Sequence, residues 1–209
     1  FGENFKQKVI MKKFALTALA MFSLLIINAQ VKIKPGIKIG LNNSTITNLE
    51  RLSGGNKSSS TSFHAGTSVS FKFTDTYTLH PEILYSEQGG KLAIGANSSK
   101  IKVNYLSLVI NNKFYIAKSK FNLQVAPVLD FLVNHKNITP KPDGFDFAIM
   151  GGIGYDFPFG MTVDLRYKQG LADLYGRNVD TGNGFQDTNV ENLLLNQVFQ
   201  LSIGYQFDF

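Results

Sequence analysis

The sequence of 209 residues contains no cysteine and no tryptophan. Without cysteine, neither a disulfide framework nor a thiolate metal site is available to the fold. Long apolar runs are scarce too: a single one occurs, near the start, which excludes a bundle of transmembrane helices. Charged residues make up only 17% of the chain, and its length is that of one domain.

The single apolar run has the features of a secretory signal peptide. It follows Met11, Lys12 and Lys13, and it ends in Asn28-Ala29-Gln30. A basic start, a short apolar core and a small residue at the cleavage point distinguish such a peptide from a transmembrane helix. The predicted parts are an upstream segment at 1–10, a signal peptide at 11–30 and a mature domain at 31–209.

The net charge of +6 overstates the basicity of the mature chain. Four lysines and one glutamate precede residue 31, so the charge falls to +3 without that segment. The remaining lysines and arginines are scattered along the sequence. A nucleic-acid partner is therefore not expected, because such proteins gather their basic residues on one face.

The last twelve residues alternate strictly between apolar and other side chains. The odd positions are Phe199, Leu201, Ile203, Tyr205, Phe207 and Phe209, and no even position from 200 to 208 is apolar. A period of two predicts a β-strand with one apolar face. Aliphatic residues give way to aromatic ones toward the end, as in strands of outer-membrane barrels. Tyr205, Phe207 and Phe209 resemble the signal by which the barrel-assembly machinery recognises its substrates.

Seven earlier segments show the same alternation. With the last, the predicted strands are 35–44, 62–74, 77–88, 101–116, 121–133, 145–157, 161–171 and 198–209. The phase changes once, at Tyr105–Leu106, where a one-residue β-bulge would restore a single apolar face.

The connections between these strands alternate in length. The short ones are 75–76, 117–120 and 158–160, and the long ones are 45–61, 89–100, 134–144 and 172–193. This alternation is typical of a meander that crosses a membrane eight times, with both termini periplasmic. An even number of strands lets the first pair with the last, which removes the free edges that lipid forbids.

The glycines separate a membrane barrel from a soluble sandwich or lipocalin-like barrel. Six of them fall on the polar faces of the strands: Gly40, Gly66, Gly152, Gly154, Gly170 and Gly204. A solvated surface gains nothing from glycine, which weakens a strand. The interior of a narrow barrel needs small residues among long ones. The sequence therefore predicts an all-β, eight-stranded antiparallel up-and-down transmembrane β-barrel.

Several strand motifs resemble those of the PorT-like outer-membrane β-barrel family of Gram-negative bacteria. The matching pieces are residues 36–42, 79–86, 103–106, 151–155, 164–171 and 204–207. The resemblance covers the whole mature chain and implies an outer-membrane location. Its motifs contain no catalytic signature, and the name-giving member is associated with protein secretion.

Charged residues on the inward faces are expected to fill the lumen. Counting along the strands places Glu82 and Arg166 at about equal height, with Asp164 on the same face as Arg166 and Lys168 beyond it. Unpaired charges in a narrow barrel cost several kcal/mol, roughly, so these groups should pair. The predicted lumen charge network is Glu82, Arg166, Asp164, Asp146 and Lys168. The charges expected at other inner levels are Asp130, Lys72 and His80.

The function expected from these patterns is that of a non-enzymatic barrel presenting its loops, with no cofactor. The loop 172–193 is the expected contact for a protein partner, and the barrel should be a monomer in lipid. A lipid-modifying enzyme and a narrow pore are the alternatives. The three histidines are too dispersed for a metal site. Residues 180–187 are interpreted as a surface loop, since Gly182 and Gly184 replace the oxygen ligands of a calcium loop.

Overall fold

The computed structural model describes residues 31–48, 56–94, 97–138, 141–174 and 193–208. The predicted upstream segment and signal peptide, most of the loop 172–193, and Phe209 lie outside the described residues. The chain from Ile33 onward forms one compact unit. Among the described residues, no helix is long and apolar enough to cross a membrane.

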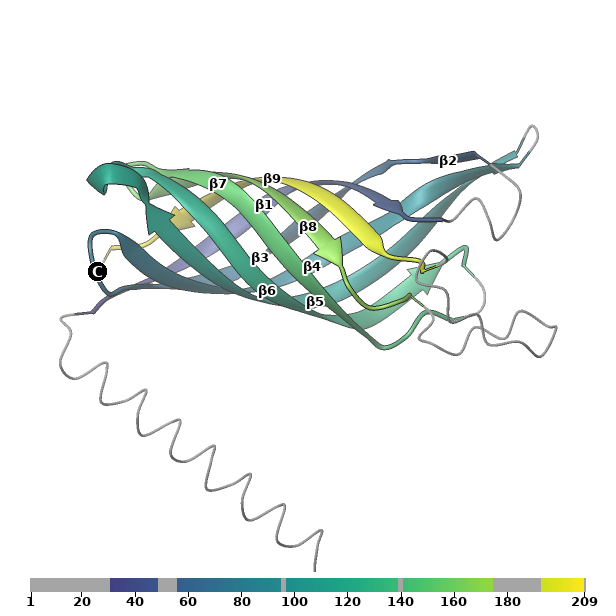
Figure 1. The fold of residues 1–209 in the computed structure, drawn as a ribbon, viewed down its shortest axis with the longest axis horizontal. Coiled ribbons are helices and arrows are strands. Elements are labelled where there is room, and N and C mark those ends of the chain that lie inside the picture. The colour runs from purple at the N-terminus through teal and green to yellow at the C-terminus, as the bar shows by residue number, and fades with distance from the viewer. Residues whose placement is uncertain (1–30, 49–55, 95–96, 139–140, 175–192, 209) are drawn as a thin grey trace, which may run out of the picture. The chain divides into compact units, whose positions relative to one another are not determined.

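The unit is a closed ring of antiparallel strands (Figure 1). The strands are β1 (Lys32–Ile46), β2 (Asn56–Ser58), β3 (Ser60–Lys72), β4 (Tyr77–Ile94), β5 (Asn97–Tyr115), β6 (Phe121–Lys136), β7 (Phe145–Asp156), β8 (Met161–Gly170) and β9 (Asn196–Gln206), with a 3-10 helix at Ile116–Lys118. Both β2 and β3 pair with β4 and are separated only by Ser59, so they act as one strand of the barrel. The predicted eight-stranded barrel is thus confirmed.

The first and last strands close the ring. β1 pairs with β9 from Gly36 opposite Gln206 to Ile46 opposite Asn196, as predicted. The short connections 73–76, 116–120 and 157–160 lie at the same end as the start of β1 and the end of β9, which we call the short-turn end (Figure 1). The opposite end is the long-loop end.

The barrel is apolar outside and largely polar inside. On β9, Leu201 and Ile203 are 51% and 56% exposed, whereas Gln200 and Ser202 are 4% and 1% exposed. The other strands repeat this arrangement, which is the reverse of a soluble protein. Lipid is the environment in which such an outer surface is stable, because the closed ring leaves no free strand edge.

The predicted loop 89–100 is wrong, because most of it is strand. β4 and β5 stay paired up to Ile94 opposite Asn97. β2 adds to the same ribbon, with Lys57 opposite Leu92. Backbone hydrogen bonds extend these strands through a Gly- and Ser-rich stretch. This stretch lacks the apolar alternation from which the other strands are predicted. The ribbon projects beyond the other strands at the long-loop end (Figure 1).

The predicted bulge in β5 is also wrong. β5 alternates without interruption, and Ile101, Val103 and Tyr105 are at most 4% exposed, on the inward face. The register shift lies in β6, where Asn134 and Leu132 pair with consecutive residues of β5 and Val133 has no partner. The phase change in the sequence therefore marks a change in the interior, which becomes apolar near the long-loop end.

Candidate functional site

The lumen holds a cluster of fully buried charges at the level of Arg166. This side chain, on β8, donates to Glu82 of β4 through both terminal nitrogens, with Nη1 2.8 Å from Oε2 and Nη2 2.8 Å from Oε1. Nη2 also donates to Asp164 Oδ2 at 3.0 Å. A forked, two-bond arginine–carboxylate pair is stronger and more strictly oriented than a single contact.

Two lysines that the sequence analysis did not select complete the cluster. Lys38 on β1 places its Nζ 2.6 Å from Glu82 Oε1 and 2.8 Å from Asp164 Oδ2. Lys113 on β5 lies 4.0 Å from Asp164 Oδ1 and 3.0 Å from Asp156 Oδ1. We call these six residues the central charge cluster: Lys38, Glu82, Lys113, Asp156, Asp164 and Arg166. Its three cations balance its three carboxylates.

The signal for Lys38 was present in the sequence. It occupies an inward position of the first strand, and the pairing of that strand with the last places it opposite Gly204. Following this pairing on to β8 brings Lys38 to the level of Thr162, one inward position from Asp164. Counting levels around the ring, and not only along two strands, would have found it.

Two predicted members of the network lie apart from Arg166. Lys168 pairs with Asp130 on β6, at 2.5 Å. Asp146 on β7 is bonded by the Asn196 side-chain amide at 3.0 Å. Lys72 shares the inward face with Thr78, its partner on β4, as predicted. It does not fill the lumen, because it lies at the rim, exposed, and pairs with Asp75 at 2.8 Å.

The two lumen histidines serve as hydrogen-bond partners. His64 lies 2.8 Å from both Asn42 Oδ1 and Ser202 Oγ. His80 lies 3.1 Å from Ser70 Oγ, and its Nε2 is 3.5 Å from Glu82 Oε1. Within the described part of the chain, no three residues of the types His, Asp and Glu are arranged to hold a metal ion.

An apolar plug fills the lumen toward the long-loop end. Its buried members come from four parts of the ring and are Ile46, Ile101, Val103, Tyr105, Leu174 and Leu194. Backbone hydrogen bonds hold the plug in place, with the Leu174 N–H bonded to the Leu194 carbonyl at 2.9 Å. The lumen thus contains a neutral charge cluster and an apolar plug in series.

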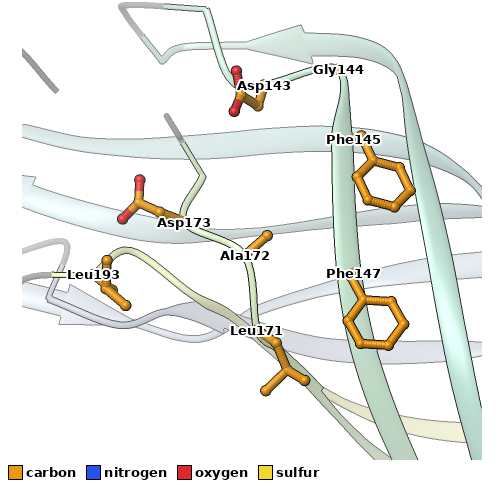
Figure 2. Close-up of a pocket in the computed structure, with 8 residues that line it drawn as sticks. All are labelled: Asp143, Gly144, Phe145, Phe147, Leu171, Ala172, Asp173 and Leu193. Atoms are coloured by element: carbon orange, nitrogen blue, oxygen red, sulfur yellow. The ribbon is translucent and has the colours of Figure 1, made fainter. Parts of the chain in front are cut away.

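A separate cavity of about 660 Å³ opens on the outer surface at the long-loop end. Figure 2 shows Phe145 and Phe147 projecting from one side of β7, beside the segment that follows β8. Asp143 and Asp173 supply its two carboxylates, and Asp173 Oδ2 accepts the Leu194 N–H at 2.8 Å. Its eight described lining residues include no histidine, serine or threonine. They offer acids, but no nucleophile and base in contact.

Comparison with protein families gives one match, which covers most of the chain. The outer membrane protein beta-barrel domain family matches residues 28–176. The chain belongs to this family. This family and the apolar outward faces of the strands place the protein in the outer membrane. No curated protein matches its sequence.

Several solved structures are similar to this outer membrane barrel. Neisserial surface protein A is 10% identical over 84% of this chain and 97% of its own, with a TM-score of 0.46. The attachment invasion locus protein of Yersinia pestis is 12% identical over 83% and 98%, with a TM-score of 0.46. The outer membrane enzyme PagL is 12% identical over 81% and 98%, with a TM-score of 0.43.

Proposed function

We propose that the protein is a non-enzymatic outer-membrane barrel that presents its long loops to a partner and does not conduct. The observation that carries this proposal is the central charge cluster. Glu82, Asp164 and Arg166 are each at most 1% exposed, and both carboxylates accept hydrogen bonds from Arg166. An arginine held in this way supports the wall of the barrel and offers no accessible acid or base for chemistry.

A narrow pore is the alternative that this proposal excludes most directly. Purified protein in planar bilayers should show no steady single-channel conductance in salt solutions of neutral pH. The physical reason is that ions would have to pass both the charge cluster and the apolar plug, in a ring whose interior is about as wide as its side chains. Steady channel openings that are absent from bilayers with a mock purification would contradict the proposal.

A lipid-modifying enzyme is the other alternative. The outer cavity is the place where such an enzyme would hold an acyl chain, since Phe145, Phe147 and Leu171 line it. The acids Asp143 and Asp173 have no nucleophile among the described lining residues to activate. This favours the non-enzymatic function.

In the proposed orientation both termini are periplasmic and the long loops face the exterior. The resemblance to the PorT-like family suggests a partner connected with protein secretion. The loop 172–193 is the longest connection, and binding residues are concentrated in loops above rigid scaffolds. We further propose that the protein is a monomer and that Tyr205, Phe207 and Phe209 form its assembly signal. Deletion of Phe209 would test this signal.

Shortening the loop tests the partner directly. Deletion of residues 180–189 should leave the heat-modifiable folded band on gels unchanged, while proteins that co-purify with the wild-type chain from native membranes are lost. The reason is that the deletion spares Leu174 and Leu194, which belong to the plug. Deletion of residues 49–55, in another long loop, controls for a general effect of shortening a loop. An unchanged set of co-purifying proteins would show that 172–193 is only a connector.

A further inference from the structure

Four lysines gather on the outward face of the barrel at the long-loop end. Lys91 lies directly opposite Lys100, and Lys102 lies directly opposite Lys136. Residues opposite each other in an antiparallel pair share a face, and residues two apart on one strand do so as well. Lys91, Lys100, Lys102 and Lys136 therefore form one surface across β4, β5 and β6, which we call the lysine face.

One carboxylate serves this surface within the described residues. Glu87 Oε1 lies 3.0 Å from Lys102 Nζ and 3.5 Å from Lys100 Nζ. The lysine face with Glu87 therefore carries three positive charges in excess. Like charges directly opposite each other destabilise a sheet. The two lysine pairs lie side by side, and a bound anion would reduce the repulsion among their ammonium groups.

The position of this surface along the barrel identifies the anion. The same outward face continues toward the membrane with Leu106 and Phe131, each 45% exposed, and Val133, which is 60% exposed. The rings of Phe63 and Tyr85, 5.9 Å apart, mark the aromatic girdle at this end. Lys102 is four residues beyond Leu106. At about 3.3 Å per residue and a strand tilt of about 40°, that is roughly 10 Å beyond the girdle, which itself lies at headgroup level. A lysine side chain that extends back along the wall reaches the headgroup phosphates from there.

We propose that the lysine face binds the anionic phosphate of a lipid headgroup in the leaflet at the long-loop end. The ammonium groups supply charge and hydrogen-bond donors to phosphate oxygens. The lipid source follows from the continuity of this face with the apolar outer wall, which the acyl chains of the same lipid would cover. The inference goes beyond the loop-presenting function and is independent of it.

Lipid competition in native mass spectrometry tests the proposal. The full-length protein, folded in a neutral detergent, is mixed with equal amounts of phosphatidic acid and phosphatidylcholine that have the same acyl chains. We expect the wild type to retain phosphatidic acid with about a tenfold or greater preference, and high salt to reduce it. The triple variant Lys100→Gln, Lys102→Gln, Lys136→Gln should bind both lipids alike.

A matched control removes the same charge at the opposite end. Lys32, Lys72 and Lys120 are exposed near the short turns, and their replacement by Gln should leave the preference unchanged. If the first triple variant does not fold, Lys102→Gln alone should lower the preference several-fold. Equal retention of both lipids by the wild type, or equal loss in both triple variants, would overturn the proposal. So would binding of soluble inositol hexakisphosphate without any preference for phosphatidic acid, which would indicate a soluble polyanion as the ligand.

Discussion

Replacing Arg166 with methionine should lower the free energy of unfolding of the barrel by about 3–5 kcal/mol, the usual effect of removing one partner from a buried ion pair. Arg166 makes three hydrogen bonds to Glu82 and Asp164, and all three side chains are buried. Without it, three carboxylates share two lysines, so the cluster holds an uncompensated negative charge. Denaturant titration of the protein folded in lipid vesicles, followed by gel mobility, measures the change.

A second variant separates charge balance from packing. Arg166→Met combined with Glu82→Met leaves Lys38 and Lys113 with Asp164 and Asp156, so the cluster is again neutral. We expect this double variant to recover more than half of the stability lost by Arg166→Met alone, because apolar side chains often replace a buried ion pair at little cost. A double variant that is less stable than Arg166→Met would show that the packing of Glu82, and not charge balance, decides the stability.

The contact of Arg166 with Glu82 illustrates what a sequence can predict about a barrel. Alternation assigns every residue to a face, and short turns fix the height at which strands begin, so residues of different strands can be assigned to one level. The level of Lys38 is harder to assign, because it depends on the register in which β1 pairs with β9, and no short turn fixes that register. Closure brings together residues that lie 126 positions apart or more, such as Lys38 and Asp164.

The error in β5 has a different cause. The prediction treated every apolar inward residue as misplaced, so Ile101, Val103 and Tyr105 seemed to require a bulge. In the structure they belong to an apolar plug whose other members, such as Ile46 and Leu194, come from distant parts of the sequence. Alternation shows which residues of a strand share a face. Whether the inward face is polar or apolar depends on the side chains that lie across the lumen from it.

The lysine face depends on strand register, which the sequence alone does not reveal. Lys91, Lys100, Lys102 and Lys136 are spread over 46 residues of sequence, so the basic residues appeared scattered. Lys91 and Lys100 also lie within the stretch 89–100, which the sequence predicts as a loop. Only the register of β4 with β5 and of β5 with β6 places them side by side.

Replacing Gly152 with valine should prevent the barrel from folding or destabilise it by about 3 kcal/mol or more, at the upper end of the range for overpacking. Gly152 lies on the inward face of β7, opposite Arg166. A Cβ atom there would lie 2.9 Å from both Cα and Cγ of Arg166, and closer still to the backbone oxygen of Leu165. The backbone cannot yield in a closed ring, and Arg166 cannot move without breaking its bonds to Glu82 and Asp164.

The neighbouring glycine provides the matched control for this substitution. Gly151 lies on the outward face of the same strand, opposite Val125 and Tyr167, and a Cβ there meets nothing nearer than the Gln124 carbonyl oxygen at 3.9 Å. Gly151→Val should therefore fold normally and match or exceed the stability of the wild type, because valine suits a strand facing lipid better than glycine does. The fraction of folded protein after refolding into vesicles, read from gel mobility before heating, distinguishes the two variants. Equal folding of both would mean that the lumen has room beside Arg166, and the interior would then not be filled by its charged side chains.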